Sequence, residues 1–233
     1  MRATSGSQMR QYAKEGAARM KRRSLLAAIL AACSAAALLA LWQGTPSGAV
    51  ADPAQEIHRL AELMHWTPQT IVADIGAGDG EYAFAAGHEL GPAGRIYATE
   101  IDDEKLKELR TEISNRKLTN VIVVEGAPGD TKLPPECCDA IFLRHVYHHI
   151  TQPQEFNRSL LHSLKPGGRL TIIDFPPWKD SAVPDGVPAN RGGHGIPQRL
   201  VVEELTSAGL QVKKQIAHWS GDDYCLLFLK PGQ

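Results

Sequence analysis

The chain has 233 residues, which is enough for one α/β domain of ordinary size and an extension. Its 25 basic and 26 acidic residues nearly cancel, so there is no global electrostatic attraction for nucleic acid or another polyanion. We therefore expect no nucleic-acid partner, and we favour a small molecule as the ligand.

Residues 1–51 form a basic N-region followed by an apolar run, which we assign to targeting. The apolar run, Leu25–Trp42, is about 18 residues long, the lower limit for a helix that crosses a membrane. A signal peptide cut after Ala51, a retained anchor with membrane contact through residues 25–42, and lipidation at Cys33 all remain open. Because the basic side stays in the cytoplasm, we expect export to the periplasmic side of a bacterial inner membrane, with a cytoplasmic protein as the alternative.

Residues 52–233 are predicted to form one domain, in which short apolar runs alternate with longer amphipathic stretches. Helices are predicted over 53–65, 81–90, 103–116, 153–164 and 198–208. Strands are predicted over 70–75, 95–100, 121–124, 140–143, 169–174, 210–218 and 224–229. The last two strands form a hairpin, and Lys165-Pro166-Gly167-Gly168 predicts a turn. This alternation is typical of a doubly wound α/β domain.

A long segment rich in proline and glycine, 175–197, has no apolar period. Loops of this length inside a domain are commonly functional, so we interpret it as a substrate lid. The adjacent Cys137 and Cys138 are expected to remain unpaired thiols, because neighbouring cysteines rarely meet the geometry of a disulfide.

Glycine recurs at every second residue in Gly76-Ala77-Gly78-Asp79-Gly80, between a predicted strand and a predicted helix. Without side chains, a ligand can approach the backbone N–H groups at the start of that helix. This arrangement indicates an adenosine-containing cofactor. A dinucleotide fingerprint has the spacing G-x-G-x-x-G, whereas here the third glycine, Gly80, comes one residue early. A nicotinamide-dependent oxidoreductase is therefore the less favoured alternative.

The second predicted strand ends in a carboxylate, Glu100, as needed to accept hydrogen bonds from two ribose hydroxyls. The glycine segment and Glu100 resemble the first motif and second-strand acid of class I S-adenosylmethionine-dependent methyltransferases. Cys138–His145 and Leu164–Leu170 resemble that family's fourth-strand motif and fifth-strand entry. The resemblance implies a Rossmann-like, mostly parallel seven-stranded sheet with an antiparallel final strand. It also implies S-adenosylmethionine as cofactor and in-line transfer of its methyl group to a small-molecule acceptor.

Carried over residue by residue, the resemblance implies a set of cofactor contacts. Asp74 would help to hold the ammonium group, Glu100 the ribose and Ile101 the adenine, while the first two glycines and the backbone near Arg144 would border the methionine part. Asp130 is a candidate contact for the adenine amino group. The predicted cofactor-binding residues are Asp74, Gly76, Ala77, Gly78, Gly80, Glu100, Ile101, Gly126, Ala127 and Arg144.

Histidines supply the candidate catalytic groups, because ligands of open α/β sheets bind beyond the carboxyl ends of the strands. His145 follows the fourth strand, and His194 lies in the long loop. We predict that these two act on the acceptor. His148 and His149 are interpreted as packing residues, and no metal site is predicted, because neutral imidazoles commonly serve as hydrogen-bonding groups.

The chain lacks an evident acceptor-recognition motif, and export would carry it away from the cytosolic supply of the cofactor. An exported S-adenosylmethionine-binding protein without transferase activity is therefore the second function that the sequence allows.

Overall fold

The computed structural model describes residues 52–232, and the predicted targeting segment lies outside them. Among these residues, no helix is long and apolar enough to cross a membrane. The helices are α2 (Pro53–Met64), α3 (Glu81–Leu90), α4 (Asp103–Arg116), α5 (Pro153–Ser163) and α6 (Gln198–Ser207), with 3-10 helices η1 (Tyr147–His149) and η2 (Ala189–Arg191). The strands are β1 (Ile71–Ile75), β2 (Arg95–Glu100), β3 (Val121–Glu125), β4 (Cys138–Arg144), β5 (Leu164–Asp174), β6 (Gln211–Ser220) and β7 (Asp223–Leu229).

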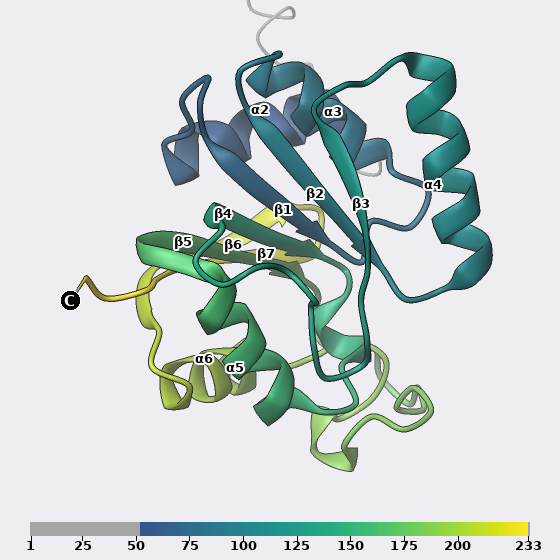
Figure 1. Ribbon diagram of the computed structural model, residues 1–233. Helices are drawn as coiled ribbons and strands as arrows, with labels where there is room; N and C mark the ends of the chain where they lie inside the picture. Colours follow the sequence, from purple (N-terminus) through teal and green to yellow (C-terminus); the bar gives the residue numbers. More distant parts are fainter. Residues whose placement is uncertain (1–51, 233) are drawn as a thin grey trace, which may run out of the picture. The chain divides into compact units, whose positions relative to one another are not determined.

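One seven-stranded sheet organises the domain, in the order β3-β2-β1-β4-β5-β7-β6 (Figure 1). The pairs from β3 to β5 are parallel, whereas β7 runs antiparallel to both β5 and β6. This confirms the predicted doubly wound fold with an antiparallel final strand. Strands β2 and β3 are added on one side of β1, and β4 and β5 on the other. The carboxyl ends of β1 and β4 therefore border the crevice where such folds bind ligands.

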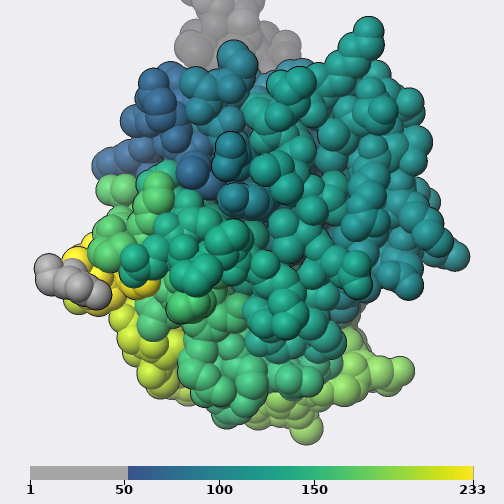
Figure 2. All heavy atoms as spheres, viewed as in Figure 1, coloured from purple at the N-terminus to yellow at the C-terminus, as the bar shows by residue number. Residues whose placement is uncertain are grey.

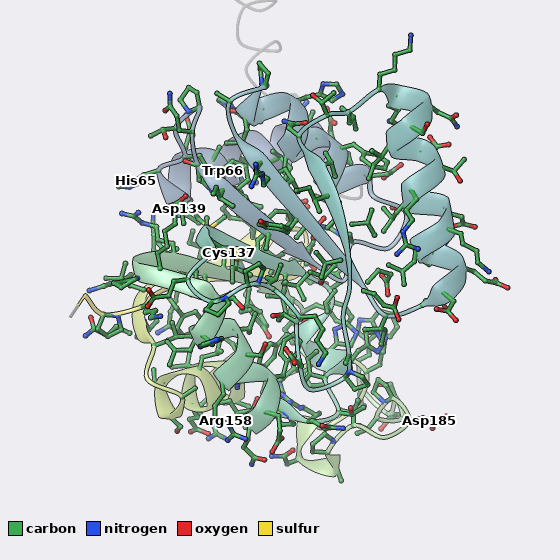
Figure 3. The ribbon with its side chains drawn as sticks, in the orientation of Figure 1. His65, Trp66, Cys137, Asp139, Arg158 and Asp185 are labelled. Atoms are coloured by element: carbon green, nitrogen blue, oxygen red, sulfur yellow. A yellow bond between two sulfur atoms is a disulfide. The ribbon has the colours of Figure 1, made fainter. Side chains whose placement is uncertain are left out.

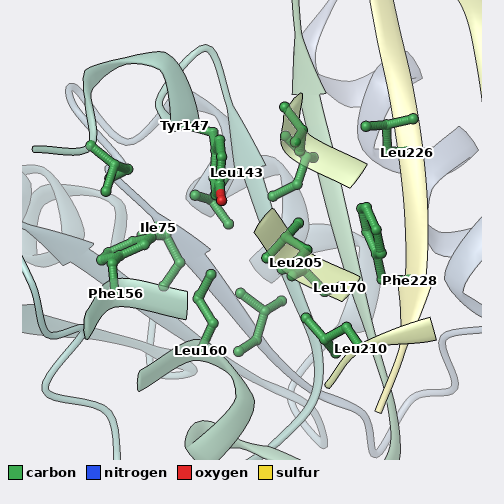
Figure 4. Close-up of a cluster of buried hydrophobic side chains, with 14 of the residues drawn as sticks. Ile75, Leu143, Tyr147, Phe156, Leu160, Leu170, Leu205, Leu210, Leu226 and Phe228 are labelled. Atoms are coloured by element: carbon green, nitrogen blue, oxygen red, sulfur yellow. The ribbon is translucent and has the colours of Figure 1, made fainter. Parts of the chain in front are cut away.

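Alternate residues of the strands face two separate hydrophobic clusters, as the two-residue period of a strand requires. Ile75, Leu143 and Leu226 pack with α5 and α6 in one cluster, part of which is shown in Figure 4. Phe142 and Leu227 belong to the other cluster, with α2, α3 and α4. Both faces of the central strands are therefore covered, which holds the strand ends, and the side chains on them, in fixed positions.

Two local predictions were wrong at the start of β4 and β5. Lys165–Gly168 lies within β5 rather than in a turn, because Leu164 already pairs with Cys138 and the register shifts before Arg169. Cys137, labelled in Figure 3, forms a disulfide with Cys138. The pair lies at the start of β4, where the register with β5 shifts between Cys138 and Ala140.

The long loop between β5 and α6 is anchored to the core rather than free along its length. Within it, Arg191 is fully buried and donates to Glu204 of α6 at 3.0 Å. Ile196 accepts a hydrogen bond from the hydroxyl of Tyr224 in β7. The loop's residues are light green at the lower edge of the face in Figure 2. These anchors position the stretch around His194 beside the carboxyl ends of β4 and β5.

Candidate active site

A cavity of about 280 Å³ opens at the carboxyl ends of β1 and β2. Its walls are mostly apolar, with one carboxylate from β2 and another from the segment after β3. Five of the predicted cofactor residues line it, namely Gly76, Glu100, Ile101, Gly126 and Ala127. The other lining residues are Ile75, Thr99, Pro128, Asp130, Thr131, Val146, His149, Ile150, Thr151 and Phe156.

The glycine turn and the acid after it are joined by backbone hydrogen bonds. The N–H of Gly78 donates to Oε2 of Glu100 at 2.9 Å, and the N–H groups of Ile101 and Asp102 donate to Oε1 at 2.6 and 3.2 Å. The Glu100 carboxylate is therefore held at the cavity wall. At Gly76, φ is +72° and a Cβ atom would lie 2.6 Å from Val146, so a larger residue would not fit there.

Asp74 lies beneath this turn at 3 % exposure, and its Oδ2 atom has no hydrogen-bond partner among the described residues. Burial, and secondarily the charges of Glu100 and Asp79, raises the pKa of Asp74 to about 8. The carboxyl group is thus poised to ionise when a cation arrives, in keeping with the predicted contact to an ammonium group.

Five predicted cofactor residues do not line the cavity: Asp74 and Gly78, described above, and Ala77, Gly80 and Arg144. Ala77 is buried in the turn, where its N–H donates to Thr99 at 2.8 Å. Gly80 begins α3, and a Cβ there would come 2.4 Å from the ring of Phe84, so this glycine serves packing. The Arg144 side chain turns toward α2, where its Nε donates to Glu56 at 3.0 Å.

Asp130, the candidate for the adenine amino group, does line the cavity. Hydrogen bonds from Lys132, and then from Ser159, lower the pKa of its carboxyl to about 2. It therefore remains ionised as a hydrogen-bond acceptor across the physiological pH range.

A second cavity, of about 400 Å³, lies beyond the ends of β4 and β5. It is lined by aromatic rings, imidazoles and two carboxylates: His145, His148, His149, Phe175, Trp178, His194, Asp222 and Asp223. Both predicted catalytic histidines are in this set. His149 lines both cavities, so the two share a wall. Burial, and then the neighbouring His148 and His194, lowers the pKa of His149.

His145 is held by charged groups on both of its ring nitrogens. Nη1 of Arg144 approaches Nδ1 at 3.2 Å, and Nε2 lies 2.8 Å from Oδ2 of Asp223. Because a guanidinium can only donate, Nδ1 accepts, and Nε2 carries the proton that is donated to Asp223. His145 also has φ of +55°, an uncommon conformation for a residue other than glycine. Its ring is thus fixed beside Asp223 at the cavity wall.

Sequence reasoning missed two acidic members of this site. Asp223 lies 78 residues after its partner His145, and Glu56 lies 88 residues before Arg144. The available signals were weak: Asp223 stands in a turn of a predicted hairpin, and Glu56 is an acid within an amphipathic helix. Neither position suggests a buried contact until the strands are assembled.

The first cavity fits the cofactor that the resemblance implies. A fixed carboxylate at the end of β2 matches a ribose, and an apolar wall formed in part by Ile101 matches an adenine. The buried Oδ2 of Asp74, which no described residue contacts by a hydrogen bond, matches a cationic group. The residues present are therefore suited to S-adenosylmethionine.

The fold and this cavity define a class I methyltransferase domain. Comparison with known proteins agrees, because residues 73–172 match the family described as the methyltransferase domain. By this match and by its fold, the described domain is similar to the class I S-adenosylmethionine-dependent methyltransferases.

Among curated proteins, the chain is similar to the ubiquinone/menaquinone biosynthesis C-methyltransferase UbiE of Pseudomonas putida strain GB-1. The two are 31 % identical over 125 residues, which cover 51 % of this chain and 49 % of the relative. The chain therefore matches about half the length of such relatives.

Among solved structures, a SAM-dependent methyltransferase from Aquifex aeolicus aligns with a TM-score of 0.63 at 20 % identity, over 78 % of this chain and 100 % of that one. The [4+2]-cyclase SpnF also aligns with a TM-score of 0.63, at 16 % identity, over 77 % of this chain and 82 % of that one. These two likenesses concern the fold alone.

Proposed function

We propose that this chain transfers the methyl group of S-adenosylmethionine to a small acceptor with an aromatic or apolar body and an ionisable group. One observation carries the proposal: the cavity suited to the cofactor and the cavity lined by aromatic rings and imidazoles share His149 as a wall. Ligands in these two cavities would therefore be neighbours, which is the first requirement of a direct displacement.

The cofactor's position would be set by side chains already in place. Glu100 would accept the ribose hydroxyls, Asp74 would face the cationic part, and Ile101 would cover the adenine. Bound S-adenosylmethionine supplies an electrophilic methyl group attached to a sulfonium. Val146 and Ile150 line the same cavity and would limit the access of water.

The acceptor would bind against Trp178 and Phe175, whose rings stack at a centroid distance of 5.2 Å. The carboxylate of Asp223, oriented by His145, would receive the proton that the acceptor loses. The curated relative is named for quinone biosynthesis, which supports an aromatic acceptor for this chain as well.

Cofactor binding is tested by calorimetric titration of the purified full chain with S-adenosylmethionine. Glu100→Ala should weaken binding about 10- to 100-fold, because the lost hydrogen bonds involve a charged group. Glu125→Ala is the matched control, since this exposed acid pairs with Glu100 at the end of the adjacent strand and does not line the cavity. Equal affinities for the two variants would overturn the assignment.

A second candidate is cofactor binding without methyl transfer, which is motivated by the lack of an evident acceptor-recognition motif in the sequence. The two functions are separated by incubating the chain with S-adenosylmethionine labelled on its methyl group and a panel of phenolic and quinol acceptors. Incorporation that is lost in Asp223→Asn supports transfer. Cofactor binding with no labelled product from any acceptor supports the second candidate.

For localisation, we propose export or anchoring through the basic N-region and the apolar residues 25–42. Mass spectrometry of the native N-terminus in fractionated cells tests this. A mature chain that begins near Asp52 or retains residues 25–42 in the membrane fraction supports it, and an intact chain in the cytosol contradicts it.

A further inference from the structure

Three histidines from two distant parts of the chain come together at the wall between the two cavities. His148 and His149 belong to η1, and His194 reaches them from the long loop. Each offers one nitrogen, and these three atoms all lie within 4.8 Å of one another. No other group of three or more possible ligand residues is found among residues 52–232.

The distance between two of these nitrogens suits a shared metal ion. Nε2 of His148 and Nε2 of His194 are 3.3 Å apart. Two imidazoles bound tetrahedrally to zinc at about 2.0–2.1 Å place their nitrogens about 3.3 Å apart, so the two rings already have the spacing of zinc ligands. His149 is exposed, so its ring can turn to bring the third nitrogen closer.

A buried carboxylate fixes the tautomer that metal binding requires. Nδ1 of His148 lies 2.8 Å from Oδ1 of Asp174, which is fully buried. The N–H groups of His148 and Phe175 also donate to this carboxylate, at 3.1 and 2.9 Å. Asp174 therefore accepts the Nδ1 proton, and the lone pair of His148 is on Nε2, toward His194. A carboxylate behind a ligating histidine is a common support of metal sites.

The other nitrogen of His194, Nδ1, is buried and has no hydrogen-bond partner among the described residues. The ring is positioned instead by its neighbours, with centroids 4.5 Å from Trp178 and 4.7 Å from His148. Without a metal, the Nε2–H of His194 can donate to the Nε2 lone pair of His148 at 3.3 Å. A metal ion would replace this proton, which leaves Nε2 of both rings as ligands.

We propose that His148, His149 and His194 bind one divalent transition-metal ion, with zinc the best match to three imidazoles, and that Asp174 is a positioning residue for His148. Three protein ligands leave a fourth position, which faces the cavity with Trp178 and Asp223. If the proposed function holds, the acceptor's oxygen or sulfur would occupy that position, and the metal's charge would favour the deprotonated form of this atom.

Metal binding is measured without cofactor or acceptor, so its outcome is independent of methyl transfer. The full chain, free of any histidine tag, is titrated with Zn²⁺ in competition with a chromogenic chelator, and the absorption bands of bound Co²⁺ are recorded. One equivalent per chain is expected. His194→Ala should weaken binding at least about tenfold, and Asp174→Asn about 10- to 100-fold with altered Co²⁺ bands. His218→Ala, which removes an exposed histidine of β6, should bind as the wild type does.

Cofactor affinity serves as the check on folding, because neither His194 nor Asp174 lines the cofactor cavity. The inference is overturned if the wild type binds no Zn²⁺ at micromolar concentration, or if His194→Ala keeps the wild-type affinity. If the chain binds metal through these histidines but transfers no methyl group, the metal site is supported and the proposed function is contradicted.

Discussion

At the scale of single residues, Asp74 shows most directly how the fold alters chemistry. The same carboxyl group on an exposed loop would be ionised at neutral pH. Here, burial at the end of β1 raises its pKa to about 8, with contributions from Glu100 and Asp79. Because this carboxyl is neutral and lies beneath the turn that borders the cofactor cavity, binding of a cationic group should depend on the release of its proton.

This dependence gives a prediction for pH. The ionised form of Asp74 binds a cation better, so the cofactor should lower the pKa and bind more tightly as pH rises. Affinity should increase by at most tenfold per pH unit below about 8 and then level off. Calorimetric titrations from pH 6 to 9 would measure it. Asp74→Asn is the control that reports any titration of the ligand itself, and identical pH profiles for variant and wild type would refute the assignment.

The site was only partly predictable from single residues. The glycine turn and Glu100 are close in sequence and their spacing reflects a local strand-turn-helix geometry, so both could be recognised. Asp223 and Glu56 could not, because their partners are distant in sequence and meet only through the sheet. His194 was selected, but its proximity to His148 was invisible for the same reason.

At the scale of elements, the sequence was most informative where local signals agree. The predicted bounds of α3, β2 and α4 match the structure, since glycine precedes α3 and Asp102 caps α4 through the N–H groups of Glu104 and Lys105. The prediction was wrong at Lys165–Gly168, where the residues favour a turn but pairing with β4 extends β5. Long-range strand pairing therefore overrode local turn chemistry.

Besides its apolar contacts, helix α2 has one buried acid that links it to three other elements of the domain. Glu56 is 2 % exposed and accepts hydrogen bonds from Tyr82 of α3 at 2.7 Å, Arg144 of β4 at 3.0 Å and Trp219 of β6 at 2.7 Å. Glu56→Ala would remove the acceptor of three hydrogen bonds and the nearer of the two carboxylates beside Arg144, so we expect the free energy of unfolding to fall by about 3 kcal/mol.

Urea denaturation measures this loss, with Glu62→Ala as the matched variant. Glu62 is on the same helix, and its side chain is 72 % exposed, so its removal should leave the denaturation midpoint unchanged. Similar midpoints for the two variants would show that the three hydrogen bonds of Glu56 do not stabilise the attachment of α2.

At the scale of the whole molecule, the described domain supplies walls for both cavities. Their lining residues all lie between Ile75 and Asp223, and both hydrophobic clusters consist of residues from Ile57 onward. The domain is also large enough to bury a core of its own. Folding and cofactor binding should therefore not require the N-terminal segment.

A chain limited to residues 52–233 should consequently unfold in one cooperative transition and bind S-adenosylmethionine within about twofold of the full chain. Cofactor at about 100 times its dissociation constant should stabilise both forms by about 2.7 kcal/mol, because it binds only the folded state. Thermal and urea denaturation with and without cofactor would test this, and Glu100→Ala in the shortened chain should abolish most of the shift. If the shortened chain folds but binds the cofactor much more weakly, residues 1–51 contribute to the site. If it aggregates, those residues are needed for folding.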